Sequence, residues 1–190
     1  MRKVGAITIG QAPRTDVTKD ILPLLGEEVE LIQAGGLDGL TREEIQAFAP
    51  GPDDYVLISR LQDGSSVIFA ERFILPRLQN CIDKLEEQGV EMILFLCTGD
   101  FPAVFHSKVP LIFPCKVLNG LVPALASRGK IAVITPTPQQ VAQSEAKWKE
   151  YVSEIIAILP LLRKCRGAGP GGPKGGGIGR GLGSDGLHRI

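Results

Sequence analysis

Short apolar runs alternate with amphipathic segments over the first 157 residues of the chain. A run that is apolar on both faces is typical of a parallel strand, because helices or other layers cover both sides of a parallel sheet. The runs predict strands at residues 4–9, 29–33, 92–96, 111–113, 131–135 and 154–157. The first of them ends at Gly10, and Cys97 follows the most apolar one.

The amphipathic segments between these runs predict helices, and several carry sequence signals at their ends. The helices are expected at residues 16–25, 42–48, 71–88, 116–127 and 138–151. Thr41-Arg42-Glu43-Glu44 is a capping box, in which the threonine hydroxyl and the third-position carboxylate bond free amides reciprocally. Thr137-Pro138-Gln139-Gln140 predicts a second capped start with proline in the first turn. Gly89 suits the left-handed position after a helix.

Residues 55–60 and 66–70 read as two further strands, joined by Gln62-Asp63-Gly64-Ser65. Asp-Gly between two such runs is a hairpin signal. The alternation of the other strands with helices predicts an α/β fold whose sheets are mostly parallel, with helices on both faces and right-handed crossovers. Such sheets bind ligands at the carboxyl ends of their strands. Two loops hold that position, residues 10–14 and 97–101.

The loop after the most apolar strand presents Cys97, Thr98, Gly99 and Asp100. A helix turn at Phe101-Pro102 would direct amides at the thiol, lower its pKa and make it nucleophilic or basic. The Thr98 hydroxyl and a backbone amide at Gly99 would hold a substrate carboxylate, while Asp100 would cap the turn. A small buried apolar cysteine fits the same pattern equally well.

In the first loop, Gln11 and Arg14 suit a carboxylate or phosphate, and arginine binds such groups with a bidentate fork. Taken alone, the loop fits a solvated arginine after a proline turn better than a binding site. Gly10-Gln11-Ala12 is not a GxGxxG fingerprint, so the sequence does not support a dinucleotide. No cofactor is implied.

The charge, the apolar stretches and the cysteine spacing give no support for a nucleic-acid, membrane or metal partner. The formal net charge is +0, with acidic and basic residues mixed, which gives no electrostatic case for nucleic acid or for an anionic membrane. No apolar stretch approaches the roughly 20 residues of a membrane span. Four cysteines, at positions 81, 97, 115 and 165, lie far apart without metal-ligand spacing, so no metal is expected. Free thiols and an N-terminus without a signal-peptide pattern predict a cytoplasmic protein.

Several segments together resemble the AroM protein family, and they occur in the family's order over about residues 3–157. The segments are residues 4–14, 40–44, 69–79, 93–101 and 129–138, followed by Lys147-Trp148. That family is similar to the aspartate/glutamate racemase superfamily. The resemblance implies two α/β lobes about a pseudo-two-fold axis, with a cysteine from each lobe facing a cleft. It places the first lobe at residues 1–116, including the hairpin near 55–70, and the start of the second at 117–157.

By this resemblance Cys97 matches the first-lobe cysteine, Thr98 and Gly99 match carboxylate-binding neighbours, and Gly10, Gln11 and Arg14 lie in the first substrate loop. It implies binding of a small carboxylate-bearing metabolite and, in intact relatives, a cofactor-independent racemase or isomerase with two thiols. One thiolate would accept the α-proton and the other thiol would donate one. A non-catalytic sensor of small anions is the alternative. Whether the chain is an enzyme, and whether it forms a homo-oligomer, stays open.

Residues 158–190 depart from the preceding pattern, since residues 165–190 are rich in glycine and contain almost no apolar residues. The family's second cysteine motif is expected in this region. We hypothesise a one-nucleotide frame error near Ala157, because a shifted frame is compatible with a helix, a strand and the motif Asp-Cys-Ile-Gly-Tyr, in that order. The second lobe would then be incomplete and the chain inactive as a racemase. A flexible glycine-rich tail is the alternative. Sequencing the gene around codon 157 distinguishes the two.

Overall fold

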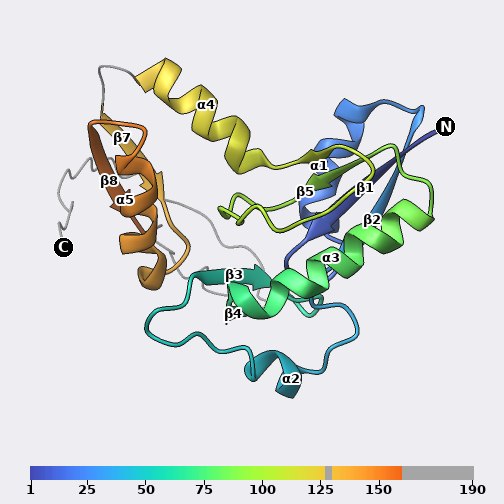
Figure 1. Cartoon of the computed structure of the whole chain (residues 1–190), viewed down its shortest axis with the longest axis horizontal. Helices are drawn as coiled ribbons and strands as arrows, with labels where there is room; N and C mark the ends of the chain where they lie inside the picture. Colours follow the sequence, from blue (N-terminus) through green and yellow to red (C-terminus); the bar gives the residue numbers. More distant parts are fainter. Residues whose placement is uncertain (127–129, 160–190) are drawn as a thin grey trace, which may run out of the picture. The chain divides into compact units, whose positions relative to one another are not determined.

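The computed structural model describes residues 1–126 and 130–159. Its main sheet has the strand order β2-β1-β5-β6. The strands are β1 (Arg2–Thr8), β2 (Val29–Gly35), β5 (Met92–Phe95) and β6 (Leu111–Ile112), and every neighbouring pair is parallel (Figure 1). The predicted α/β fold built on a mostly parallel sheet is therefore confirmed.

Two smaller sheets complete the described strands. β3 (Val56–Arg60) and β4 (Ser66–Ala70) form the predicted antiparallel hairpin. β7 (Lys130–Ile134) and β8 (Glu154–Ile158) pair in parallel, in register from Lys130 opposite Glu154. The division into a first lobe at 1–116 and a second at 117–157 stays a prediction. The predictions for residues 160–190 lie outside the described residues.

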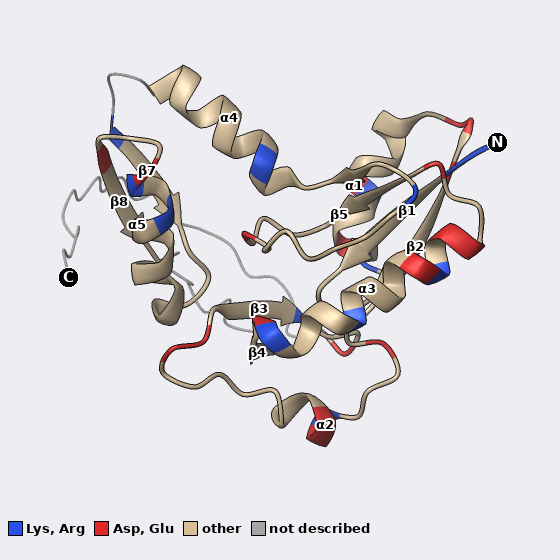
Figure 2. Cartoon of the chain, viewed as in Figure 1, with Lys and Arg blue, Asp and Glu red and all other residues tan. Residues whose placement is uncertain are grey.

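The helices follow the predicted segments closely. They are α1 (Thr15–Leu25), α2 (Arg42–Gln46), α3 (Glu71–Glu87), α4 (Pro114–Ala126) and α5 (Val141–Lys149). The capping box at α2 is present, since the Thr41 hydroxyl accepts from the Glu44 amide and the Glu44 carboxylate accepts from the Thr41 amide. Gly89, just past α3, has a φ of 76°, as its left-handed position requires. Acidic and basic residues both occur along the helices other than α4, which has no acidic residue (Figure 2).

The core lies between the main sheet and α3. The stripe Ile74, Leu78, Ile82 and Leu85 of α3 is fully buried, because residues three or four apart share one helix face. These side chains belong to the same buried cluster as Ile7 of β1 and Phe95 of β5. Burying a side chain of this size contributes about 1.5–3 kcal/mol, so this packing fixes the strand ends on which the candidate site depends.

Two local predictions were wrong. No helix turn follows Cys97, because residues 97–110 are irregular in the structure and four phenylalanines hold this loop instead. Thr137 precedes a short 3₁₀ turn (Pro138–Gln140), and its side chain makes no capping hydrogen bond. Cys115 lies in the first turn of α4, where it is buried.

The four phenylalanines are Phe95, Phe101, Phe105 and Phe113. Their ring centroids lie 4.4 to 6.3 Å apart, within the range of favourable aromatic pairs. Phe95 ends β5 and Phe113 follows β6. Their stacked rings therefore pack together at the two ends of the loop that connects these strands. This packing fixes the loop that carries Cys97 without regular secondary structure.

Candidate functional site

The two predicted site loops converge because their strands are neighbours. β1 and β5 pair in parallel with Ile7 opposite Phe95, so the residues that follow each strand leave the sheet at the same edge. Arg14 from the first loop and Cys97 and Thr98 from the second line one open cavity of about 560 Å³. The hairpin contributes Ser59 and Arg60 to the same cavity.

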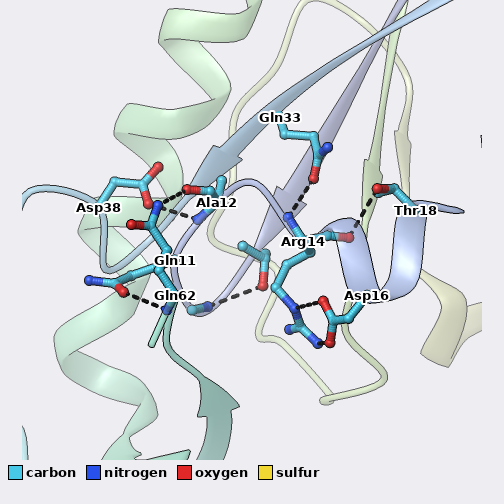
Figure 3. Close-up of polar contacts among 10 residues, drawn as sticks. Gln11, Ala12, Arg14, Asp16, Thr18, Gln33, Asp38 and Gln62 are labelled. Carbon is cyan, nitrogen blue, oxygen red and sulfur yellow. Dashed lines mark hydrogen bonds and ion pairs between the residues drawn. The ribbon is translucent and has the colours of Figure 1, made fainter. Parts of the chain in front are cut away.

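Backbone-directed hydrogen bonds order the first loop, as Figure 3 shows. The Ala12 amide donates to Asp38 Oδ1 at 2.8 Å, and the Arg14 amide donates to Gln33 Oε1 at 2.8 Å. The Thr18 hydroxyl donates to the Arg14 carbonyl oxygen at 3.0 Å, which joins the loop to α1. The Ala12–Pro13 peptide is cis. The three hydrogen bonds hold the backbone at Arg14, from which its side chain extends towards the cavity.

The Arg14 guanidinium forms a bidentate pair with Asp16, at 2.7 Å from Nε and 2.8 Å from Nη2 (Figure 3). This pairing holds the pKa of the Asp16 carboxyl below its ordinary value. The Arg14 side chain is 18% exposed, and the pair uses two of the five guanidinium N–H donors. Three donors are left for a ligand, although Asp16 offsets part of the positive charge.

Gly10 and Gln11 both contact the β3–β4 hairpin. A Cβ at Gly10 would lie 2.2 Å from Ser59 Oγ, so glycine permits the close approach of β3 to the first loop. Gln11 Oε1 accepts a hydrogen bond from the Gln62 amide at 3.0 Å. Neither residue is among those that line the cavity. Their role in ligand binding stays a prediction.

Cys97 is half-buried, and its thiol differs from the one that the sequence predicted. The Gly99 amide donates to Sγ at 3.3 Å, which favours the thiolate, but burial outweighs this bond and raises the pKa of the Cys97 thiol to about 11. The predicted lowering of the pKa is wrong because no helix begins behind the thiol. Cys97 is therefore protonated at neutral pH.

The remaining residues of the second loop differ in which cavity they line. Thr98 is exposed and lines both the first cavity and an adjoining one of about 300 Å³. Gly99 lines only the second. Asp100 lines neither, and its amide donates to the Tyr55 hydroxyl at 3.3 Å. The expected roles of these three residues in ligand binding stay predictions.

The second cavity joins the Cys97 loop to α5 and the hairpin. It shares Cys97, Thr98, Ile9, Ile58 and Pro136 with the first. Its polar lining also includes Tyr55, Thr135, Gln140, Gln143, Ser144 and Lys147, with Trp148 beside them.

Sequence reasoning missed four residues near Cys97. Ser59 Oγ and Thr135 Oγ1 are buried without a hydrogen-bond partner among the described residues, and each lines a cavity. Lys147 lines the second cavity. Glu71, at the start of α3, has its pKa raised to about 7 by burial and by the charge of Asp100. The resemblance included Lys147, but no local pattern assigned a function to any of the four.

The described residues contain no cluster of three or more His, Cys, Asp or Glu side chains suited to a metal ion. Their three cysteines, Cys81, Cys97 and Cys115, are free. None of the described helices combines the length and apolar character needed to cross a membrane.

Comparison with known proteins supports the resemblance. The profile of the family described as "AroM protein" matches residues 4–160. The chain belongs to the AroM family. A solved structure, an aspartate racemase from Picrophilus torridus, is similar with a TM-score of 0.48 and 16% sequence identity. That match covers 85% of this AroM-family chain and 63% of the racemase chain, so the chain spans less than two thirds of the racemase's length. No curated protein matches the chain.

Proposed function

We propose that this chain binds a small carboxylate-bearing molecule in the cavity that Arg14, Thr98 and Cys97 line. The observation that carries the proposal is the convergence of Arg14 with the Cys97 loop at the carboxyl edge of a parallel sheet. Arginine donors match the two oxygens of a carboxylate, and the Thr98 hydroxyl adds a further donor. We assign Gly10, Gln11, Gly99 and Asp100 to the same proposed binding site, since they lie in the two loops that carry Arg14 and Cys97.

Replacement of Arg14 by glutamine tests the proposal, with succinate and acetate as probes in calorimetric titrations of the full chain. We expect the affinity to fall by about tenfold or more, since a hydrogen bond to a charged group contributes roughly 1.5–3 kcal/mol. Arg2→Gln is the matched control, because Arg2 also donates two hydrogen bonds to a carboxylate, both to Glu91 Oε2, but does not line the cavity. Equal affinities for the two variants would refute the assignment of Arg14.

The protonation state of the Cys97 thiol favours a non-catalytic role for the proposed site, that of a sensor or binding protein. Proton exchange at an α-carbon needs a base to take the proton as the C–H bond breaks and an acid to return one. A thiol with a pKa of about 11 is suited to the acid and not to the base. Among the described residues that line either cavity, Cys97 is the one thiol.

Incubation of the chain with aspartate and glutamate enantiomers in deuterated water distinguishes the two forms. A binding protein leaves the α-proton signal in the NMR spectrum unchanged while calorimetry detects binding. Loss of that signal, abolished by Cys97→Ser, would show that the chain is a racemase or isomerase instead.

A further inference from the structure

The ammonium group of Lys147 is poorly satisfied for a group with so little exposure. Its side chain is 12% exposed. Nζ makes one long hydrogen bond, 3.4 Å to the Thr98 carbonyl oxygen. It forms a long ion pair with Asp100 Oδ2 at 3.9 Å, beyond hydrogen-bond distance, and lies 5.5 Å from the centroid of the Trp148 ring. An ammonium has three donors, so two of them make no hydrogen bond to the described residues. A buried cation is costly unless it is paired and hydrogen-bonded.

Thr135 presents a second unsatisfied group to the same space. It is 2% exposed, its Oγ1 has no hydrogen-bond partner among the described residues, and it lines the second cavity together with Lys147. Buried hydroxyls in folded proteins nearly always have a partner, which can be protein, an ordered water, an ion or a ligand. An ammonium with two donors to spare and a hydroxyl without a partner among the described residues therefore line one cavity beside Cys97.

We propose that Lys147 and Thr135 form an anion-binding subsite in the second cavity, for a carboxylate or phosphate group of the ligand. The ammonium supplies the charge and the hydroxyl supplies a neutral donor. Gln140, Gln143 and Ser144 add polar lining. Since the two cavities share Cys97 and Thr98, this subsite adjoins the carboxylate site that we propose around Arg14. It extends that proposed function but does not depend on Arg14.

Negative charge near the subsite comes from Asp100, the ion-pair partner of Lys147, and from Glu71, whose charge interacts with Asp100 and with Cys97. Neither carboxylate lines the cavity, and the Asp100 carboxylate is 3.9 Å from Lys147. The pKa of Glu71 is about 7, so at mildly acidic pH its carboxyl is largely uncharged. Anion binding at Lys147 is therefore expected to strengthen as the pH falls from about 8 to 6.

Trp148 gives a direct readout, because it is the single tryptophan of the chain and it lines the second cavity. Its fluorescence is measured while the full chain is titrated with sodium acetate or inorganic phosphate, against sodium chloride at equal ionic strength. We expect a saturable change with at least one probe. Acetate alone indicates a carboxylate subsite, and phosphate alone a phosphate subsite. No saturable change with either probe would overturn the proposal.

Variants assign the response to the two residues. Lys147→Met is expected to weaken anion binding at least about tenfold, and Lys147→Arg to restore most of it. Thr135→Val removes the hydroxyl at nearly constant volume, and a loss of about threefold or more is expected without loss of thermal stability. Lys149→Met is the control, since Lys149 is exposed on the same helix. Binding that survives both Lys147→Met and Thr135→Val would refute the subsite.

Arg14→Gln separates this proposal from the proposed function. It is expected to leave the Trp148 response to small anions unchanged while it weakens succinate binding in calorimetry. Loss of succinate binding in Arg14→Gln without any effect of Lys147→Met would preserve the Arg14 site and overturn the second subsite.

Discussion

The side chain of Gln143 pairs with the backbone of Val56 in both directions, as a neighbouring strand would. The Val56 amide donates to Gln143 Oε1 at 2.9 Å, and Gln143 Nε2 donates to the Val56 carbonyl oxygen at 3.2 Å. Gln140 Nε2 donates to the same carbonyl oxygen at 3.0 Å. Two glutamines thus join α5 and the turn before it to the first residue of β3, and both line the second cavity.

Replacement of Gln143 by alanine should lower the free energy of unfolding by about 1–3 kcal/mol, because two hydrogen bonds to a partly buried backbone are lost. Urea unfolding followed by Trp148 fluorescence measures this. Gln139→Ala is the control, since Gln139 is exposed and lies in the turn beside Gln140. An equal effect of both substitutions would show that the pairing with Val56 adds no stability.

Alkylation of Cys97 by iodoacetamide should be slow at neutral pH and rise with pH. With the pKa at about 11, the thiolate fraction grows about tenfold for each pH unit up to pH 10. Peptide mapping by mass spectrometry should place the first label on Cys97, which lines both cavities, before Cys81 or Cys115 in the core. A rate that levels off near pH 7 would contradict the raised pKa.

Glu71 should make stability depend on pH. Its folded pKa of about 7 lies above the ordinary 4.5, so the ionised form is disfavoured in the folded state. The penalty is absent below pH 4.5, grows as the pH rises and is complete above pH 7. The free energy of unfolding of Glu71→Gln should therefore rise relative to that of the parent chain as the pH goes from 5 to 8. We expect a rise of about 1–2 kcal/mol, allowing for the partial exposure of Glu71. A pH-independent difference would count against the shift, and Glu87→Gln, an exposed change on α3, is the control.

Gly10→Ala tests whether this glycine serves packing or ligand binding. The added methyl group would lie 2.2 Å from Ser59 Oγ and 2.9 Å from the Arg60 carbonyl oxygen, so we expect a loss of about 1–3 kcal/mol in urea unfolding. Ser59→Gly in the same chain should restore part of it, because the nearest clashing atom is removed. Unchanged stability with weakened succinate binding would assign Gly10 to the ligand instead.

Local patterns predicted the elements well, because periodicity, capping and turn residues act within a few positions. The capping box at Thr41 and the buried stripe of α3 are examples. Even the meeting of Arg14 with Cys97 followed from the rule that parallel strands end at one edge. The pKa of Cys97 did not, because it depends on the surroundings that bury the thiol. The phenylalanines that hold its loop come from four positions between 95 and 113, and their packing has no local signature.

Lys147 and Thr135 could not be assigned from sequence for a related reason. Each belongs to an unremarkable local pattern, a helix face and a strand end. The chemistry that we propose for them arises only where α5 and the end of β7 border the Cys97 loop, so that an ammonium with donors to spare and a hydroxyl without a partner among the described residues line one cavity. Whether a hydrogen-bond donor lacks an acceptor depends on the folded structure, so it cannot be predicted from the spacing of residues along the sequence.

The packed rings of Phe95, Phe101, Phe105 and Phe113 have a consequence for the energetics of association. A loop that becomes ordered only on binding spends part of the interaction free energy on lost backbone and side-chain entropy. Here Phe95, Phe101 and Phe113 are each at most 8% exposed, so the loop between them is already ordered in the free chain. A ligand bound at Cys97, as we propose, would therefore meet a preorganised surface, and none of its contact energy would be spent on ordering this loop.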